Sequence, residues 1–294
     1  MHREKYSRNI PYLYSNIYTL SDARSIKIQF YFFSLLPRMF CYHQHMLPSQ
    51  PFIAFLLSSA KFLRLRGGES IATGVWAEEL LLPWRELRAN GWPILFLSPD
   101  GAAVQIDPQS LLLENLAGDR NKQRYLEQES ALLPLTDTLS ITSIFPLLPA
   151  LRGVFLPGGN GPLVDFPESA AVGTFLRHCQ QQNVPVASLC HGAAALLAHP
   201  SPGQDRPFAG FQVSCFQKLE EEQTSLAGRW PYHLAERLQG SGFSVRAGAP
   251  WQAQVIQDRN LLSGQNPASA LPLAWALLER LEENRRYRGS RHGY

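Results

Sequence analysis

A cysteine between a strand pattern and a helix pattern is the first residue of this chain that could carry chemistry. Residues 184–198 read VPVASLCHGAAALLA, in which Cys190 stands between an uncharged apolar run and an alanine-rich run. The apolar run is typical of a strand buried on both faces of a parallel sheet, and the alanine-rich run of a helix. A thiol at this junction lies where a ligand crevice is expected, and the helix N-terminus would lower its pKa. Hydrolases place a serine nucleophile in a similar strand-to-helix turn.

The same pattern also fits a cysteine with no chemical role. Free cysteine is among the residue types most often buried, and a turn between a strand and a helix is a common place for it. The segment alone leaves both interpretations of Cys190 open.

Two further segments could act on a substrate beside that thiol. Residues 158–161 read GGNG directly after the apolar run 154–156, and glycines there let backbone N–H groups approach an oxyanion. An ordinary tight turn would have the same sequence. Glu78 and Glu79 open a helix pattern, where one of them could serve as a general acid or base. Acidic residues are also favoured in any first helical turn.

These residues must be positioned by alternating strands and helices. Apolar runs predict strands at 51–57, 94–97, 154–156, 184–189 and 211–216, and a final hairpin from 251–256 and 261–263. Helical spacing and end signals predict helices at 78–90, 120–132, 168–181, 193–198, 231–239 and 268–282, and the glycines near residue 67 predict a loop over 63–72. The alternation predicts an α/β fold with a largely parallel sheet.

Composition excludes several classes of protein. The 294 residues are 45% hydrophobic and 17% charged, with a net charge of +3, which argues against a strong field for nucleic acid or membrane surfaces. No apolar run is long enough to span a membrane. The four cysteines show no metal-binding spacing, which indicates free thiols in a reducing compartment and a cytoplasmic protein.

Both ends of the chain differ from its middle. Residues 1–47 lack a sustained period, and we expect a poorly structured extension there, with residues 1–45 a candidate for an upstream, wrongly assigned start. Residues 48–284 are expected to form one α/β domain. Residues 285–294 concentrate arginines and are expected to be a solvated basic tail.

An ordered set of motifs now makes the chain resemble a known superfamily. It is similar to the ThiJ/PfpI superfamily, also called class I glutamine amidotransferase-like, and within it to the branch of heat-shock chaperones and glyoxalase III proteins. The matching segments span most of residues 51–282 and are 73–80 with Pro83, 97–101, 106–108, 154–162 with Asp165, 184–192, 220–222 and 262–269. The resemblance implies a flavodoxin-like three-layer sandwich with a mostly parallel central sheet and a nucleophile elbow at Cys190.

The resemblance also implies roles for individual residues. Cys190 matches the nucleophile, His191 its histidine partner, and Glu79 the glutamate beside the thiol, with Glu78 the weaker match. An acid after residues 212–216 would complete the triad. We place it at Glu221, with Glu220 as the alternative.

The loop above the thiol departs from the pattern of the branch. Gly159 and His191 would supply oxyanion N–H groups, but Asn160 stands where the branch usually has histidine. Asparagine can donate a hydrogen bond but cannot shuttle a proton, so substrate preference and rate are in question. The histidine-plus-acid metal site of some relatives has no match, and we expect neither metal nor cofactor.

The resemblance implies a cofactor-independent glyoxalase III that converts methylglyoxal to lactate, or a related protein deglycase, acting through the thiolate. The expected partners are a small 2-oxoaldehyde and a second copy of the chain as a homodimer, with no nucleic acid and no membrane. Two alternatives stay open: a holding chaperone with a vestigial site, and a cysteine amidase or peptidase that uses Cys190, His191 and Glu221.

Overall fold

The computed structural model describes residues 50–201 and 203–291, with side chains through Tyr287. The extension expected at residues 1–47 and Cys41 within it lie outside the described residues. The described residues belong to one unit of internal contacts, which is larger than the domain expected over 48–284.

A seven-stranded sheet forms the centre of this unit. Its order is β10-β11-β7-β6-β1-β4-β5, and every neighbouring pair is parallel except β10 with β11. The strands are β1 (Phe52–Leu56), β4 (Ile94–Ser98), β5 (Leu139–Ser140), β6 (Leu151–Leu156), β7 (Val186–Leu189), β10 (Val255–Asp258) and β11 (Leu261–Gly264). The mixed α/β fold with a mostly parallel central sheet is therefore confirmed, and so is the final hairpin.

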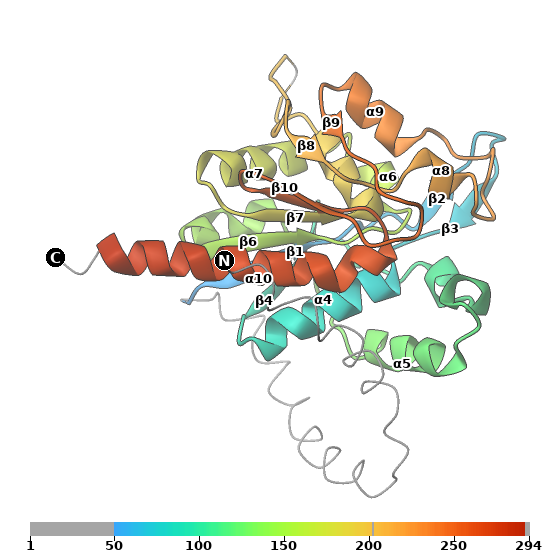
Figure 1. Ribbon diagram of the computed structural model, residues 1–294, viewed down its shortest axis with the longest axis horizontal. Coiled ribbons are helices and arrows are strands. Elements are labelled where there is room, and N and C mark those ends of the chain that lie inside the picture. The colour runs from blue at the N-terminus through green and yellow to red at the C-terminus, as the bar shows by residue number, and fades with distance from the viewer. Residues whose placement is uncertain (1–49, 202, 292–294) are drawn as a thin grey trace, which may run out of the picture. The chain divides into compact units, whose positions relative to one another are not determined.

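Helices cover both faces of the sheet, which gives three layers (Figure 1). On one face lie α4 (Ala77–Ala89) and α10 (Ala270–Arg291), which pack against each other. On the other face lie α6 (Pro162–Asp165), α7 (Ala170–Gln181) and the 3-10 helix η4 (Cys190–Leu197). The remaining helices are α5 (Arg120–Ser130), α8 (Lys218–Glu221), α9 (Leu234–Gly240), η1 (Pro108–Leu111), η2 (Leu113–Leu116), η3 (Thr142–Ala150) and η5 (Pro267–Ser269).

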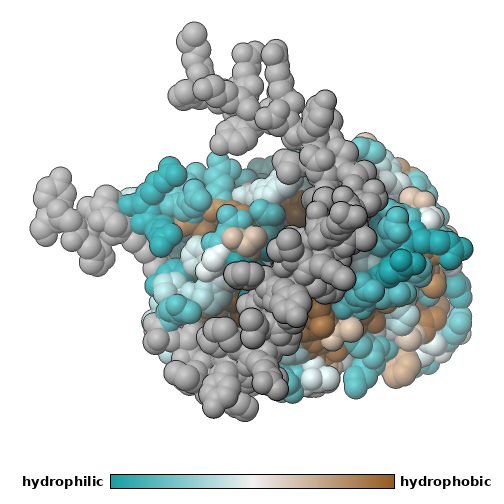
Figure 2. All heavy atoms as spheres, turned by 90° about the horizontal axis from the view of Figure 1, so that it is seen from below, coloured by the Kyte–Doolittle hydropathy of each residue, from teal (hydrophilic) through white to brown (hydrophobic). Residues whose placement is uncertain are grey.

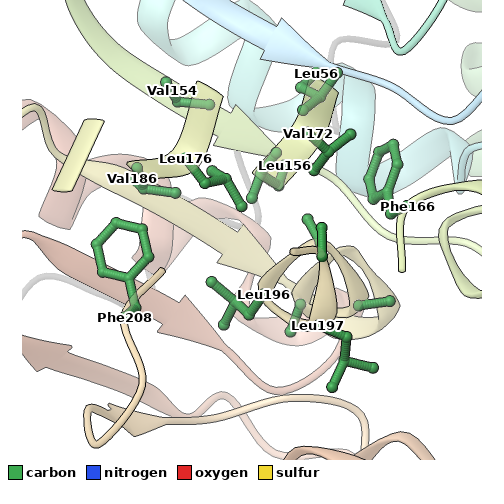
Figure 3. Close-up of a cluster of buried hydrophobic side chains, with 14 of the residues drawn as sticks. Leu56, Val154, Leu156, Phe166, Val172, Leu176, Val186, Leu196, Leu197 and Phe208 are labelled. Atoms are coloured by element: carbon green, nitrogen blue, oxygen red, sulfur yellow. The ribbon is translucent and has the colours of Figure 1, made fainter. Parts of the chain in front are cut away.

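Side-chain alternation along the strands creates a core on each face. In β1, Phe52, Ala54 and Leu56 point to one core, while Ile53 and Phe55 point to the other. All five are fully buried, which is why this strand has no polar face in the sequence. The first core surrounds η4, whose leucines lie among side chains of the central strands and α7 (Figure 3).

Two short pairings were not expected from the sequence. The segment expected to be a loop, 63–72, contains the antiparallel strands β2 (Phe62–Arg64) and β3 (Ser70–Ala72). Each has three residues, too few for a visible alternation, and the only fully buried side chain in them is Leu63. The strand expected at 211–216 is reduced to β8 (Gln212–Val213), which pairs with β9 (Ser244–Val245) outside the central sheet.

The C-terminal helix is longer than the sequence indicated. We expected a helix to residue 282 and a basic tail from 285, but α10 continues to Arg291. Charged side chains on successive turns allow this continuation: Arg286 lies 3.5 Å from Glu282, an i,i+4 ion pair on the helix surface. Residues 285–291 are therefore helical, and the side chains of Arg285, Arg286 and Tyr287 are exposed to solvent.

The surface of the described part is mixed in character. In the view from below, the uncovered side chains are largely hydrophilic, with hydrophobic side chains in smaller patches between them (Figure 2). None of the helices in the described residues combines the length and the apolar composition that crossing a bilayer requires.

Candidate active site

Cys190 occupies a sharp turn at the end of β7. Its φ of +56° is left-handed, a conformation uncommon for residues other than glycine, and it turns the backbone directly from the strand into η4. Gly192 is required two residues later, because a Cβ there would lie 2.3 Å from the backbone oxygen of Leu156. The elbow thus leaves the Cys190 side chain 5% exposed at the wall of a cavity.

Glu79, on α4, is the acid beside the thiol. Its side chain is fully buried, and its Oε2 accepts a hydrogen bond from the N–H of Gly158 at 2.8 Å. The carboxyl also interacts with the Cys190 thiol, although its Oε1 has no partner with standard hydrogen-bond geometry. Glu78 points away and forms an ion pair with Lys122 at 2.6 Å. Of the two glutamates considered from the sequence, the structure therefore brings Glu79 to Cys190.

The glycine turn after β6 is built to let these groups meet. A Cβ on Gly158 would lie 2.6 Å from Glu79 Oε2, 2.8 Å from Cys190 Cβ and 2.9 Å from the backbone N of His191. Gly159 has a φ of +102°, and a Cβ there would lie 2.4 Å from the backbone oxygen of Gly74. Any side chain at either position would push the acid, the thiol or the neighbouring backbone apart.

Burial and charge determine how the acid and the thiol hold protons. Burial raises the pKa of Glu79 to about 8. Burial, followed by the negative charge of Glu79, raises the pKa of the Cys190 thiol well above its usual value, and the His191 N–H opposes this only in part. The lowering expected from a helix N-terminus is therefore wrong. Because both pKa values are raised and two adjacent buried charges repel, the pair holds its protons at neutral pH, and after the loss of one proton the two groups share the other.

The raised pKa of Glu79 predicts a pH-dependent cost to stability. Between pH 4.5 and 8, the unfolded chain releases this proton while the folded chain keeps it, so the free energy of unfolding falls as pH rises, by up to about 1.4 kcal/mol per pH unit. Glu79→Gln cannot ionise, and its stability should lack this decline. Urea denaturation of both proteins at pH 5, 6, 7 and 8 measures the difference. Parallel curves for the two proteins would contradict a buried, proton-retaining Glu79.

A buried carboxylate joins His191 to a second histidine. Glu221 is fully buried, its Oε1 lies 3.1 Å from Nε2 of His191, and its Oε2 lies 2.5 Å from Nδ1 of His233. Burial would raise the pKa of Glu221, but the two histidines outweigh burial and lower it. The His191 ring is also held by Phe216 and Trp230, with ring centroids 4.9 and 5.2 Å away.

Glu220 has a different environment from its neighbour. It accepts hydrogen bonds from the backbone N–H of Trp251 at 2.8 Å and from the side chain of Asn266 at 2.7 Å. The structure therefore pairs His191 with Glu221 and not with the alternative, Glu220. His233 was not among the site residues expected from the sequence, since it lies at the N-cap of α9 and no spacing rule links it to α8.

Asp107 holds the loops on which the glycine turn rests. It accepts from the Thr73 hydroxyl at 2.9 Å and from the N–H of Gln109 at 2.9 Å, and the backbone N–H of Asn160 lies 3.5 Å away. Asn160 itself is 6% exposed and lines the cavity. Asp107 belongs to a motif recognised from the sequence (106–108), but its contacts with Thr73 and Asn160 could not be inferred from the sequence.

These groups open into one cavity of about 590 Å³. Its wall includes all of the positions expected from the sequence except Glu221, which lies behind His191: Glu79, Gly159, Asn160, Cys190 and His191. Within the described ranges, no three histidine, cysteine or acidic side chains converge in a way that could hold a metal ion. The arrangement offers a nucleophile, an acid that can give and take its proton, and backbone N–H groups at one point.

Comparisons of the sequence with known proteins identify relatives of this chain. A family model described as the DJ-1/PfpI family matches residues 149–280. The chain is 27% identical over 223 residues to the protein/nucleic acid deglycase HchA of Escherichia coli O157:H7, covering 74% of this chain and 76% of the relative.

Solved structures share the fold. The rapid encystment protein of Francisella tularensis aligns with a TM-score of 0.65 at 23% identity, over 79% of this chain and 99% of that one. Glyoxalase III from Candida albicans aligns with a TM-score of 0.63 at 20% identity, over 78% and 96% of the two chains.

Proposed function

We propose that this chain, which a DJ-1/PfpI family model matches over residues 149–280, is a cysteine-dependent enzyme that converts 2-oxoaldehydes such as methylglyoxal to 2-hydroxy acids without a cofactor. The observation that supports the proposal is the pair of Cys190 and Glu79, which are buried together against Gly158 and whose pKa values are both raised. This reaction needs one nucleophile and one acid/base group that changes its role between steps.

The first half of the reaction uses the pair after it has lost one of its two protons to solvent. The state with a Cys190 thiolate and a protonated Glu79 attacks the aldehyde carbon, which forms a C–S bond. Glu79 gives its proton to the aldehyde oxygen, so a neutral hemithioacetal results and Glu79 becomes a carboxylate. The N–H groups of Gly159 and His191 are proposed to stabilise the oxygen while its negative charge develops.

The second half moves protons between adjacent carbons. The Glu79 carboxylate removes the proton from the former aldehyde carbon to give an enediol and returns a proton to the neighbouring carbon, while the hydroxyl proton passes to the second oxygen. The product is a thioester of Cys190. Water then cleaves the C–S bond and releases lactate, so that one methylglyoxal and one water give one lactate, with no external oxidant or reductant.

Deglycation would use the same groups. An adduct of methylglyoxal with an amine or thiol releases the aldehyde reversibly, and attack by Cys190 on the adduct carbon would lead to the same hemithioacetal. The name of the E. coli relative supports this extension.

The surroundings of the thiol favour this chemistry over amide hydrolysis. A cysteine hydrolase relies on an imidazole that accepts the proton of the thiol. Here Glu79 is the side chain that interacts with Cys190, whereas His191 acts on the thiol through its backbone N–H. The imidazole of His191 faces Glu221 at 3.1 Å.

The test is lactate formation from methylglyoxal by the purified protein in the absence of glutathione and in the presence of a metal chelator. We expect saturable turnover. A second series uses methylglyoxal equilibrated with N-acetylarginine. If lactate forms only as fast as the remaining free methylglyoxal allows, the protein is a glyoxalase. Faster formation indicates deglycation as well.

Absence of lactate in both series would overturn the proposal. If such a protein nevertheless suppressed the aggregation of a heated client protein, the holding chaperone considered from the sequence would take its place.

A further inference from the structure

The cavity above Cys190 is much larger than the reaction centre needs. Methylglyoxal has five non-hydrogen atoms, yet the cavity measures about 590 Å³. Cavities of roughly 300–1,000 Å³ bury ligands of drug size. A three-carbon aldehyde bound at the thiol would leave most of this volume to water.

Four aromatic side chains lie in the cavity wall among polar ones. Trp76, Phe216, Trp230 and Trp251 all contribute to it. Phe216 links the catalytic end to the outer end, because its ring packs against His191 with centroids 4.9 Å apart and against Trp251 with centroids 5.6 Å apart. Indole and phenyl rings favour planar apolar groups, which they contact by offset stacking or by their edges.

The charged residues in the described cavity wall favour a substrate whose substituent is neutral. Apart from Glu79, Cys190 and His191, the only ionisable side chain in it is that of Glu114, and neither lysine nor arginine is present. An anionic substituent such as a phosphate or a carboxylate would have no cationic partner there and would be repelled by Glu114.

Trp251 is held in place as a fixed wall. Its φ of +60° is unusual for a bulky residue, and such strain persists only where the surroundings enforce it. The enforcing contacts are two: its backbone N–H donates to the buried Glu220 at 2.8 Å, and its indole N–H donates to Gln223 at 2.6 Å. Its side chain nevertheless remains 43% exposed and lines the cavity, so the ring is held in place and still accessible.

We propose that the preferred substrates are 2-oxoaldehydes whose keto carbon bears an aromatic or similarly large, planar, neutral group, and that Trp251 determines this preference. The inference rests on the proposed function and specifies its substrate class. The bonds that form and break are unchanged: phenylglyoxal and one water give mandelate, through a C–S bond to Cys190 and a proton transfer between the two carbonyl carbons. The ring takes no part in the chemistry and packs against the cavity side of Phe216 and Trp251, whose own rings are in contact with each other.

The experiment compares kcat/KM for phenylglyoxal and methylglyoxal in the wild type and in Trp251→Gly. Glycine adopts a φ of +60° without strain, so this substitution removes the ring and spares the backbone. We expect the wild type to prefer phenylglyoxal, and the ratio of the two kcat/KM values to fall about tenfold or more in the variant, mainly through KM for phenylglyoxal. Trp275→Ala is the matched control, because Trp275 is 42% exposed on α10 and is not part of the cavity wall.

The outcomes separate this inference from the proposed function. Turnover of methylglyoxal with no preference for phenylglyoxal, or an unchanged ratio in a Trp251→Gly protein that melts cooperatively, would overturn the inference alone. Should Trp251→Gly fail to fold, Trp251→Leu, which keeps an apolar side chain but no ring, must lower the same ratio. No turnover of either aldehyde by the wild type would overturn the proposed function itself.

Discussion

Cys190→Ala is expected to abolish lactate formation from methylglyoxal, with kcat lowered by about 10⁴-fold or more. Alanine cannot form the C–S bond on which every later step depends, and Glu79 alone cannot activate water in its place because its pKa of about 8 keeps it protonated at neutral pH. The substitution removes one atom from a site that borders a cavity, so the fold should persist. Lactate assays and thermal melts of both proteins provide the measurement.

The matched control for this variant is Cys179→Ala. Cys179 is a fully buried free cysteine on α7, in the core on the η4 face of the sheet. This variant should retain wild-type turnover at a temperature well below its melting point, with a modest loss of stability from the missing sulfur. If Cys190→Ala kept more than a small fraction of wild-type activity, a covalent mechanism through this thiol would be ruled out.

Gly158→Ala is expected to lower kcat/KM by about 100-fold or more while every catalytic side chain is still present. The new methyl group would meet Glu79 Oε2 at 2.6 Å and Cys190 Cβ at 2.8 Å, so at least one of them must move. A displacement near 1 Å within a reacting pair costs on the order of 10²-fold in rate. The strain should also lower the free energy of unfolding by about 1–3 kcal/mol. Single-turnover kinetics and urea denaturation measure the two effects.

Gly153→Ala tests whether the effect is local. Gly153 lies earlier in the same strand, β6, and a methyl group there would find its nearest atom at 3.4 Å, on Leu281, an ordinary contact. This variant should keep wild-type kcat/KM. Equal losses in the two variants would mean that any change in β6 impairs the enzyme, and full activity of Gly158→Ala would mean that the close approach of acid and thiol is unnecessary.

The parts of the fold that the sequence predicted well are those with long apolar runs. The strands β1, β4, β6 and β7 are buried on both faces, so each appears as an uninterrupted apolar segment between turn residues. The hairpin of β2 and β3 was missed because three-residue strands leave no periodic signal. The helical continuation to Arg291 was missed because an arginine-rich segment resembles a tail unless its ion pairs are known.

The site was predictable where residues adjacent in sequence share a role. Cys190 and the glycine turn each directly follow a buried strand in the sequence. The carboxyl ends of parallel strands meet at one edge of the sheet, so both could be placed at the same site. The choice between Glu78 and Glu79 needed the resemblance, since the sequence does not show which side of α4 faces the sheet. The direction of the thiol pKa was wrong, because it depends on burial and on the charge of an acid 111 positions earlier in the chain. His233 and its contact with Glu221 depend on a similar long-range meeting.

The left-handed backbone of Cys190 implies that catalysis and robustness pull this position in opposite directions. At a φ of +56°, any residue with a Cβ is strained, by roughly 1–2 kcal/mol, and only glycine escapes. Glycine at residue 190 would therefore give a more stable protein that, under the proposed mechanism, is inactive. Cysteine at this position costs stability that glycine would recover, and the proposed mechanism makes this a trade-off between stability and activity at a single residue.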